Sequence, residues 1–335
     1  MTHTVLTRRG FLASSAAFAA AGCAGVSRPT GPVKIEKCGT IDIYITEANP
    51  IVFGGKLWLM EYIRYNKKSG KRYRHNNLGD SYFRFRDLSA MNRFSALFGK
   101  GLHMGNAFVR DERIIVTAVE NWGEPRFYQL ESDDMVHWTE PRVILEDPEW
   151  AGYNTTICKT EDRFILSFEL GEPKRLVGSA FTMFFAESKD LKNWKVIDGA
   201  VMGRECYTGA PMLRYHGGWF YYFHLRSERG GYHTRVSRSR DLFKWELSPH
   251  VVLNYDPVED RKLHPGVAFT AAESAQIAVA KDINASDLDM CEYRGELVCC
   301  YSWGDQRGKE FLSLGRADCT EREFCESYFK SPPCH

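Results

Sequence analysis

The chain has 335 residues, of which 44% are hydrophobic and 13% aromatic, and its formal net charge at pH 7 is +1. That much apolar material can bury a large core, in one β domain or in two ordinary domains. Because 44 Lys and Arg residues balance 43 Asp and Glu residues, no overall field attracts nucleic acid or an anionic membrane surface, and we expect no nucleic-acid partner.

The amino-terminal segment indicates export. The pair Arg8-Arg9 precedes an apolar stretch, Phe11 to Ala21, that is too short to span a bilayer, as in a twin-arginine signal peptide. Ala20-Ala21-Gly22-Cys23 then resembles a lipoprotein cleavage box. We therefore expect a signal over residues 1–22, a tether over 23–33 and an exported periplasmic or cell-surface lipoprotein, held to the membrane only by a lipid on Cys23.

Three copies of the phrase Ser-x-Asp-(Leu/Met)-x-x-Trp recur along the chain, at Ser132–Trp138, Ser188–Trp194 and Ser239–Trp245. Their spacing of roughly 50 to 56 residues is typical of propeller blades. In each copy Ser and Asp can bind backbone amides in a tight turn, while Trp can pack between sheets. We interpret the phrases as scaffold.

A second unit occurs five times: an apolar strand, a short turn and a stronger aromatic or apolar strand. The copies begin at Asn49, Asn106, Asn154, Ala210 and Asp287. Each copy is typical of the inner strand pair of a blade, so the sequence predicts an all-β fold, a five-bladed β-propeller of four-stranded antiparallel blades. The predicted propeller spans residues 34–330, with blades at about 34–100, 101–148, 149–203, 204–262 and 263–330.

The first strands of all blades line the central channel of a propeller, so residues near their starts converge there. The set is polar, aromatic and weakly charged, which suits an oligosaccharide. The predicted sugar-binding residues are Asn49, His103, Asn106, Tyr153, Asn154, Tyr207, Thr208 and Asp289, together with Trp303, whose ring could stack on a sugar.

Sugar hydrolysis requires one group that protonates the leaving oxygen and another that activates water or attacks the anomeric carbon. Glu47, Asp287 and Glu205 are the candidate carboxylates, and His264 is a candidate general acid. For each carboxylate the alternative is a solvated rim position. The alternative for His264 is a loop histidine that stabilises the turn before Pro265.

Apart from Cys23 the chain has nine cysteines, an odd number that cannot all pair, and several are expected to be buried thiols. None shows CxxC spacing, so we predict no zinc site, no catalytic metal and no cofactor. A structural Ca²⁺ held mostly by water is compatible with the sequence, because such a site leaves little trace in it. The oligomeric state stays open.

The five repeats with their Ser-x-Asp-Leu-x-x-Trp phrases resemble the five-bladed propeller glycosidases of glycoside hydrolase families 43, 32 and 117. In the last blade, NASDLDMCEYRGELVCCYSWGDQRGKEFL from Asn284 is similar to a segment of family 117, the neoagarooligosaccharide hydrolases. The resemblance implies an exo-acting, inverting glycoside hydrolase on a plant or algal oligosaccharide, with its active site in the central funnel.

The match departs from these families at the positions that carry their chemistry. Asn49 stands where they place a catalytic Asp before Pro, and Gly209 stands where family 43 has its acid Glu. Met212 takes the position of an Asp of family 117, whereas His264 fits its proposed acid His. Two interpretations follow: a relocated set, with Glu47 or Asp287 as base and His264 or Glu205 as acid, or a noncatalytic carbohydrate-binding propeller.

Overall fold

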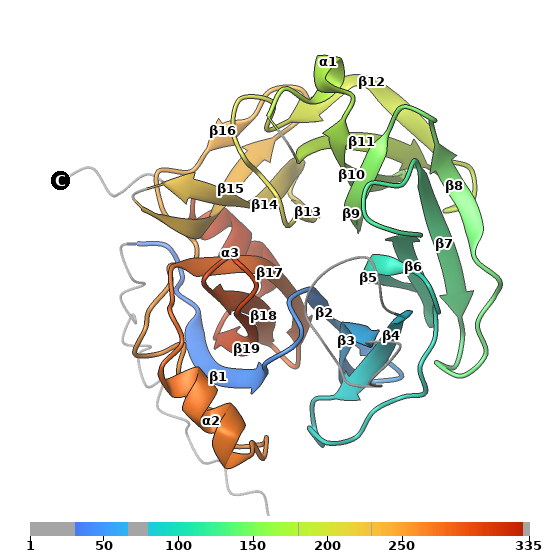
Figure 1. The fold of residues 1–335 in the computed structure, drawn as a ribbon. Coiled ribbons are helices and arrows are strands. Elements are labelled where there is room, and N and C mark those ends of the chain that lie inside the picture. The colour runs from blue at the N-terminus through green and yellow to red at the C-terminus, as the bar shows by residue number, and fades with distance from the viewer. Residues whose placement is uncertain (1–30, 66–79, 180, 229, 331–335) are drawn as a thin grey trace, which may run out of the picture.

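The computed structural model describes residues 31–65, 80–179, 181–228 and 230–330. Over these residues the chain forms nineteen strands and three short helices, arranged as antiparallel blades around a central channel (Figure 1). The predicted all-β propeller is confirmed. The predicted signal peptide and Cys23 lie outside the described residues. No helix in the described ranges has the length and apolar character needed to cross a bilayer.

The blades follow one another along the chain, and in each the first strand lies nearest the channel. Blade one contains β2 (Ala48–Phe53), β3 (Lys56–Tyr65) and β4 (Asp80–Asp87), with bridges from Phe94 and Phe98 along its outer edge. Blade two contains β5 (His103–Arg110), β6 (Arg113–Val119), β7 (Arg126–Ser132) and β8 (Arg142–Glu146). Blade three contains β9 (Ala151–Lys159), β10 (Phe164–Glu172), the helix α1 (Lys174–Val177), β11 (Thr182–Ser188) and β12 (Lys195–Met202). Blade four contains β13 (Met212–His216), β14 (Trp219–Glu228), β15 (Gly231–Ser239) and β16 (Glu246–Leu247).

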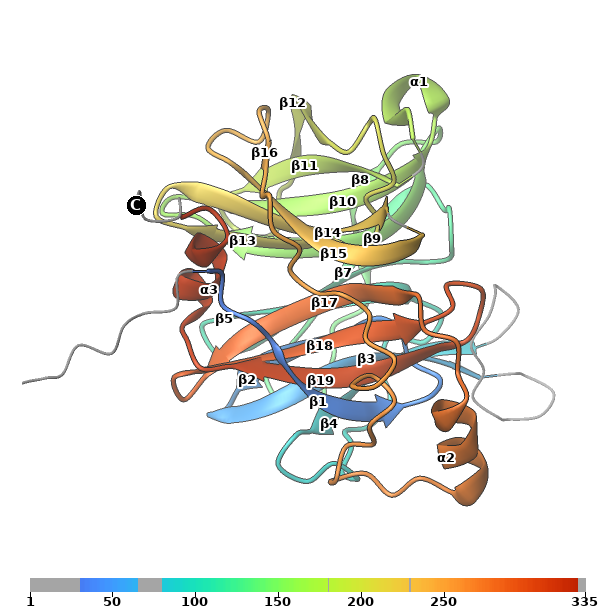
Figure 2. The ribbon, with the colours of Figure 1, turned by 90° about the vertical axis from the view of Figure 1, so that its left-hand side faces the viewer.

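The last blade takes its outer strand from the start of the described chain. It contains β17 (Asn284–Tyr293), β18 (Glu296–Gly304), β19 (Glu310–Ala317) and β1 (Glu36–Asp42), and its flanking helices are α2 (Ala271–Ala278) and α3 (Glu321–Ser327). β1 runs antiparallel beside β19 (Figure 2). The predicted first blade, 34–100, therefore differs from the observed one, because its first segment closes the ring on blade five.

The inner strand pairs predicted from the sequence are the first two strands of each blade. Their two-residue turns use left-handed backbone, with φ of 56° and 69° at Gly54 and Gly55 and of 48° and 58° at Asp111 and Glu112. Two successive positive φ values are the geometry of a type I′ hairpin, whose twist matches that of the flanking strands.

The Ser-x-Asp phrases form the turns that end the third strands. In the first copy the Ser132 hydroxyl accepts a hydrogen bond from Met135 N (2.9 Å), and Asp134 accepts from Val136 N (2.8 Å). Trp138 then stacks on Phe98 of the preceding blade, with ring centroids 3.8 Å apart. The phrases therefore fasten neighbouring blades together, as scaffold residues would.

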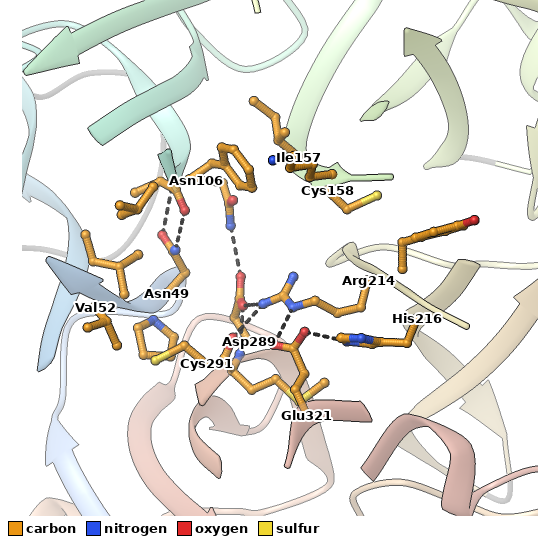
Figure 3. A pocket seen from close by; sticks show the side chains of 18 residues that line it. Asn49, Val52, Asn106, Ile157, Cys158, Arg214, His216, Asp289, Cys291 and Glu321 are labelled. Carbon is orange, nitrogen blue, oxygen red and sulfur yellow. Dashed lines mark hydrogen bonds and ion pairs between the residues drawn. The ribbon is translucent and has the colours of Figure 1, made fainter. Parts of the chain in front are cut away.

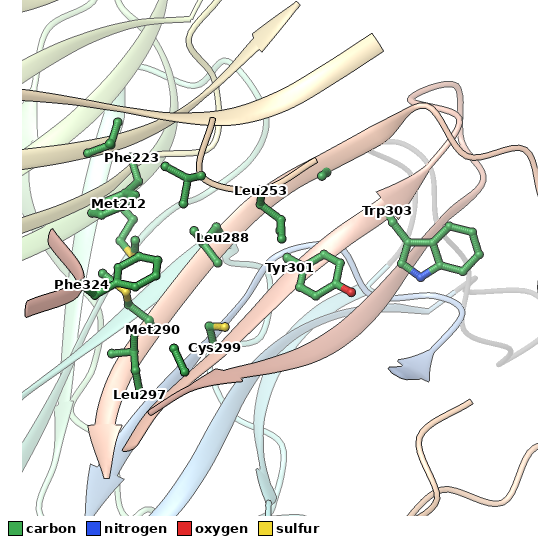
Figure 4. Packing of buried hydrophobic residues seen from close by; sticks show 14 of the residues in the cluster. Met212, Phe223, Leu253, Leu288, Met290, Leu297, Cys299, Tyr301, Trp303 and Phe324 are labelled. Atoms are coloured by element: carbon green, nitrogen blue, oxygen red, sulfur yellow. The ribbon is translucent and has the colours of Figure 1, made fainter. Parts of the chain in front are cut away.

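The apolar core lies between blades. Figure 4 shows the cluster between blades four and five, where Met212 and Phe223 face Leu288 and Met290. Cys299 and Cys325 are fully buried in the same cluster. None of the eight cysteines in the described ranges forms a disulfide, and burial raises the pKa of both of these thiols.

Candidate active site

A cavity of about 220 Å³ opens at the end of the channel where the inner strands begin. Four acidic side chains line it, together with four aromatic rings and four further polar side chains. The acids are Glu47, Glu169, Asp287 and Glu310; the rings are Trp122, Tyr153, Phe181 and Tyr207; the polar residues are Thr46, Arg64, Asn154 and Gln306. Every blade contributes at least one of these side chains. The wall combines acids with aromatic rings, which can stack on a sugar.

The backbone bends sharply where three inner strands enter the cavity. Met104, Ala210 and Asp287 have φ of 51°, 62° and 52° and line its wall. Asp287 lies in a register shift of β17, between Ser286 and Asp289. Left-handed backbone is unfavourable for residues with a side chain and clusters at functional sites. Left-handed backbone at three strand starts therefore makes this end of the channel the candidate functional site.

Glu169 is a buried carboxyl group that faces the cavity from the second strand of blade three. It is 1% exposed, and its Oε2 accepts hydrogen bonds from Asn154 Nδ2 (2.8 Å) and Asn154 N (3.3 Å). Its Oε1 has no hydrogen-bond partner among the described residues. Burial raises the pKa of Glu169 to about 7, and the Glu47 carboxylate adds to the rise, against the Asn154 bonds. Near neutral pH the protonated form of Glu169 is therefore substantially populated.

Glu47 and Asp287 lie in the same cavity, as their positions at strand starts predict. Glu47 is half-buried, and Thr46 Oγ1 donates a hydrogen bond of 2.6 Å to its Oε2. Burial raises the pKa of Asp287 well above its usual range, and the adjacent Glu47 raises it further. Burial and the neighbouring Glu47 therefore favour the protonated form of Asp287.

Blade four has Gly209 at the position where family 43 has its acid Glu. A Cβ placed on Gly209 would lie 3.4 Å from Glu169 Oε1 and 3.2 Å from the Tyr207 hydroxyl. The Glu169 carboxyl group therefore lies directly beside the position from which a side chain at 209 would start. A carboxyl group of blade three, that of Glu169, thus lies beside this position of blade four.

Asn49 has a structural role that a carboxylate could not fill. Its Nδ2 donates to Ala107 O (2.9 Å), and its Oδ1 accepts from Ala107 N (3.0 Å), so one amide joins β2 to β5. It is 3% exposed and lines the opposite end of the channel. Asn49, which stands where the families have Asp, thus connects blades one and two.

Asn106 and Asp289 close the channel at its middle. Asn106 Nδ2 donates to Asp289 Oδ2 (2.9 Å), and Arg214 Nη2 donates to Asp289 Oδ1 (2.6 Å), as Figure 3 shows. Arg214 also binds Glu321 at the start of α3 (3.1 Å). The bridge connects blades two, five and four, so the two residues form a floor beneath the cavity.

Three further predicted sugar-binding residues lie in the cavity wall, and two others, Thr208 and His103, are buried structural residues. Tyr153, Asn154 and Tyr207 line the cavity. Thr208 is fully buried and donates to Phe181 O, and His103 is buried against the Tyr62 hydroxyl, with its pKa lowered to about 4 by burial and by Arg64.

The expected open face of Trp303 is not observed. Its side chain is 0% exposed, its ring stacks on Phe311 at 4.3 Å, and its Nε1 donates to Thr40 Oγ1 (2.9 Å). Figure 4 shows Trp303 within the hydrophobic cluster. Because both partners are interior residues, no face is left for a sugar.

His264 and Glu205, the two candidate acids, do not line the cavity. His264 N donates to Thr40 O of β1 (3.0 Å), at the outer strand of blade five, and its Nδ1 accepts from Gly266 N (3.1 Å). These contacts match the alternative of a turn-stabilising loop histidine. Glu205 is exposed on the connection between β12 and β13.

The sequence prediction did not include Glu169, Arg64, Gln306 and Glu310. These residues lie outside the starts of the first strands, where the candidate acids and most sugar-binding residues were expected. The sequence does contain a signal for Glu169. It is a carboxylate within the largely apolar run FILSFEL, and burying an unpaired charge there costs free energy.

The channel does not suit a calcium ion. No three His, Cys, Asp or Glu side chains in the described part of the chain are grouped to hold a metal. At the centre, both Asp289 oxygens already accept hydrogen bonds from Asn106 and Arg214. The Arg214 guanidinium supplies the positive charge there.

No protein-family profile matches this chain, and no curated protein sequence does. Solved structures match its fold. The α-L-arabinofuranosidase of Podospora anserina, in complex with cellotriose, has a TM-score of 0.56 at 10% identity over 91% of this chain and 99% of its own. The family 62 α-L-arabinofuranosidase catalytic domain of Coprinopsis cinerea has a TM-score of 0.56 at 11% identity over 87% and 100%.

This chain shares the fold of the five-bladed propeller glycoside hydrolases. The xylan β-1,4-xylosidase of Bacillus halodurans also matches, with a TM-score of 0.54 at 12% identity over 84% of this chain, which spans 54% of the xylosidase chain. At these identities the likeness establishes the fold alone. The closer resemblance of the last blade to family 117 stays a prediction.

Proposed function

We propose that this chain is a glycoside hydrolase that removes the terminal sugar of a plant or algal oligosaccharide. The observation that carries the proposal is the pair Glu169 and Glu47: a buried carboxyl group whose pKa is raised to about 7, and a half-buried carboxyl group in the same cavity. Glycoside hydrolysis uses two carboxyl groups, one as acid and one as base, and a raised pKa suits the acid.

In the proposed reaction the Glu169 carboxyl group is the general acid. Its Oε1, which lacks a partner in the described protein, is the oxygen free to face the substrate. It donates its proton to the glycosidic oxygen as the bond from that oxygen to the anomeric carbon breaks. Asn154 holds the other carboxyl oxygen and so fixes the orientation of the acid.

Glu47 is the proposed general base. It takes a proton from a water molecule whose oxygen attacks the anomeric carbon from the opposite face of the ring. The products are a free sugar with inverted configuration and a shortened oligosaccharide. The proton of Glu169 ends on the leaving oxygen of the shortened oligosaccharide, and Glu47 holds the proton taken from water. The raised pKa of Asp287 favours its neutral form and so weakens its repulsion of Glu47.

The closed floor favours action at a chain end. The Asn106–Asp289–Arg214 bridge crosses the channel below the cavity, and we propose that an oligosaccharide enters by its terminus and does not pass through. The inverting outcome is supported by the family resemblance of the sequence. Proton NMR of the first product formed would assign its anomeric configuration and so test it.

The decisive test is a panel of plant and algal oligosaccharides with product detection by mass spectrometry. We expect a terminal sugar to be released by the wild type and the rate to fall by about two to four orders of magnitude in Glu169→Gln and in Glu47→Gln. Glu205→Gln and His264→Ala are matched controls outside the cavity and should retain turnover. Saturable glycan binding with no product at high protein concentration would instead identify a noncatalytic propeller.

We further propose that the protein is exported and carried on the membrane by a lipid at Cys23. The twin-arginine pair and the cleavage box support this placement. Mass spectrometry of the mature protein should find cleavage before Cys23 and a diacylglycerol adduct. A Cys23→Ala form that stays in the membrane fraction would contradict the anchor.

A further inference from the structure

Arg64 is a buried cation in the wall of the candidate active site. It lies on β3 and is 6% exposed, and its guanidinium lies 5.1 Å from the ring centre of Tyr62 and 5.5 Å from that of Trp122. Ring contacts of this kind hold the plane of a guanidinium while leaving its N–H groups free.

No acidic side chain in the described part of the chain forms an ion pair with Arg64, and its Nη1 is buried without a hydrogen-bond partner there. Glu47 lines the same cavity but is not paired with it. By contrast, Arg86, which is buried in blade one, and Arg214, which is partly buried in the channel, bind carboxylates directly. A buried charge without a partner is costly, so a partner from outside the chain would relieve that cost.

The other charges of the cavity permit an anion. Burial raises the pKa values of Glu169 and Asp287, which favours the neutral form of two of the four acidic side chains. Their repulsion of an anionic ligand is weakened accordingly. Arg64 is the one Lys or Arg side chain among the described residues that line this wall.

We propose that Arg64 binds an anionic group on the terminal sugar, the carboxylate of a uronic acid or a sulfate ester. Two parallel N–H groups of a guanidinium match the two oxygens of either anion. This inference rests on the proposed function, since it assumes that the cavity accepts a sugar ring. It narrows the substrate class to acidic oligosaccharides.

The test uses matched pairs of oligosaccharides with the full-length protein at one fixed, physiological ionic strength. One pair is a uronic acid oligosaccharide and its methyl ester, and the other is a sulfated oligosaccharide and its desulfated form. Hydrolysis is followed by mass spectrometry, and binding is followed by calorimetry with the Glu169→Gln protein. We expect the wild type to prefer the anionic member of one pair by at least about ten-fold, and that pair identifies the anion.

In Arg64→Met this preference should fall at least about ten-fold, and Arg64→Lys should keep part of it, because lysine retains the charge but not the fork. The matched control is Arg126→Met, an exposed arginine over Tyr128 and paired with Glu120, which should leave the preference unchanged. Equal or better use of both neutral members by the wild type would overturn the proposal. Selective binding of an anionic member without any hydrolysis would uphold the Arg64 subsite and reject the proposed hydrolase.

Discussion

At the scale of single residues, the candidate site shows how a propeller can lack two expected carboxylates and still hold an acid and a base. Asn49 connects two blades, and Gly209 leaves room for a carboxyl group from the next strand pair. In the proposed reaction the acid is Glu169 and the base is Glu47. Both departures from the family pattern therefore have a physical role in this chain.

Glu169→Gln should separate activity from stability. The folded-state pKa of Glu169, about 7, lies above its ordinary value of 4.5, so its contribution to stability is fully present below pH 4.5 and is lost as the pH rises through 7. At pH 8 the wild type carries a buried carboxylate that glutamine lacks. We expect the variant to lose activity on the oligosaccharide and yet to melt at a higher temperature than the wild type at pH 8, with the difference vanishing near pH 4.5. Calorimetric melting at both pH values would measure this, and a lower melting temperature at pH 8 would contradict it.

Asn49→Asp tests whether this position is a lost catalytic base. A carboxylate cannot donate to Ala107 O, and it would face that carbonyl while buried. We expect a loss of about 1–3 kcal/mol in the free energy of unfolding and no gain in hydrolysis. Urea denaturation and a turnover assay check both, and a clear gain in turnover would restore Asn49 as the position of the base.

Gly209→Ala tests the space beside Glu169. Its added methyl group would lie 3.2 Å from the Tyr207 hydroxyl and 3.4 Å from Glu169 Oε1, so it should displace the acid without unfolding the blade. We expect kcat to fall about ten-fold, with little change in the melting temperature. Gly295→Ala, at a hairpin turn with open space around it but positive φ, offers a comparison in which only stability should fall.

At the scale of elements, the strand that closes the ring depends on a buried ion pair. Lys37 of β1 binds Asp260 at 2.6 Å, and Asp260 also accepts a hydrogen bond from Tyr301 (2.8 Å). Burial, and then the charge of Asp260, raise the pKa of nearby Asp282 to about 7. A single lysine therefore neutralises a cluster of acids beneath β1.

Lys37→Met should destabilise the protein by about 3–5 kcal/mol, because it leaves Asp260 buried without its counter-ion. Since Asp282 has a raised folded-state pKa, its share of stability is present below its ordinary pKa of 3.8 and is lost as the pH rises through 7. The loss in the variant should accordingly be larger at pH 8 than at pH 5. Denaturation at the two pH values measures it, with the exposed Lys34→Met as control.

At the scale of the whole molecule, the sequence repeats were sufficient to predict the propeller but not its closure or its acid. Gly54-Gly55 and the Ser-x-Asp turns are local signals, set by backbone conformations that few residues adopt. The pairing of β1 with β19 joins Glu36 and Arg316, which are 280 positions apart in the sequence, and has no such local signal. The place of Glu169 likewise has no local signal, because it depends on blade three packing beside Gly209 of blade four.

The most direct test of the central claim, that Glu169 protonates the leaving oxygen, is the dependence of its loss on the leaving group. We would compare Glu169→Gln with the wild type on the identified oligosaccharide and on a dinitrophenyl glycoside of the same terminal sugar. Because dinitrophenolate leaves without a proton, the variant should retain nearly wild-type kcat on the aryl glycoside while losing about two to four orders of magnitude on the oligosaccharide. An equal loss on both substrates would contradict the assignment of Glu169 as the acid.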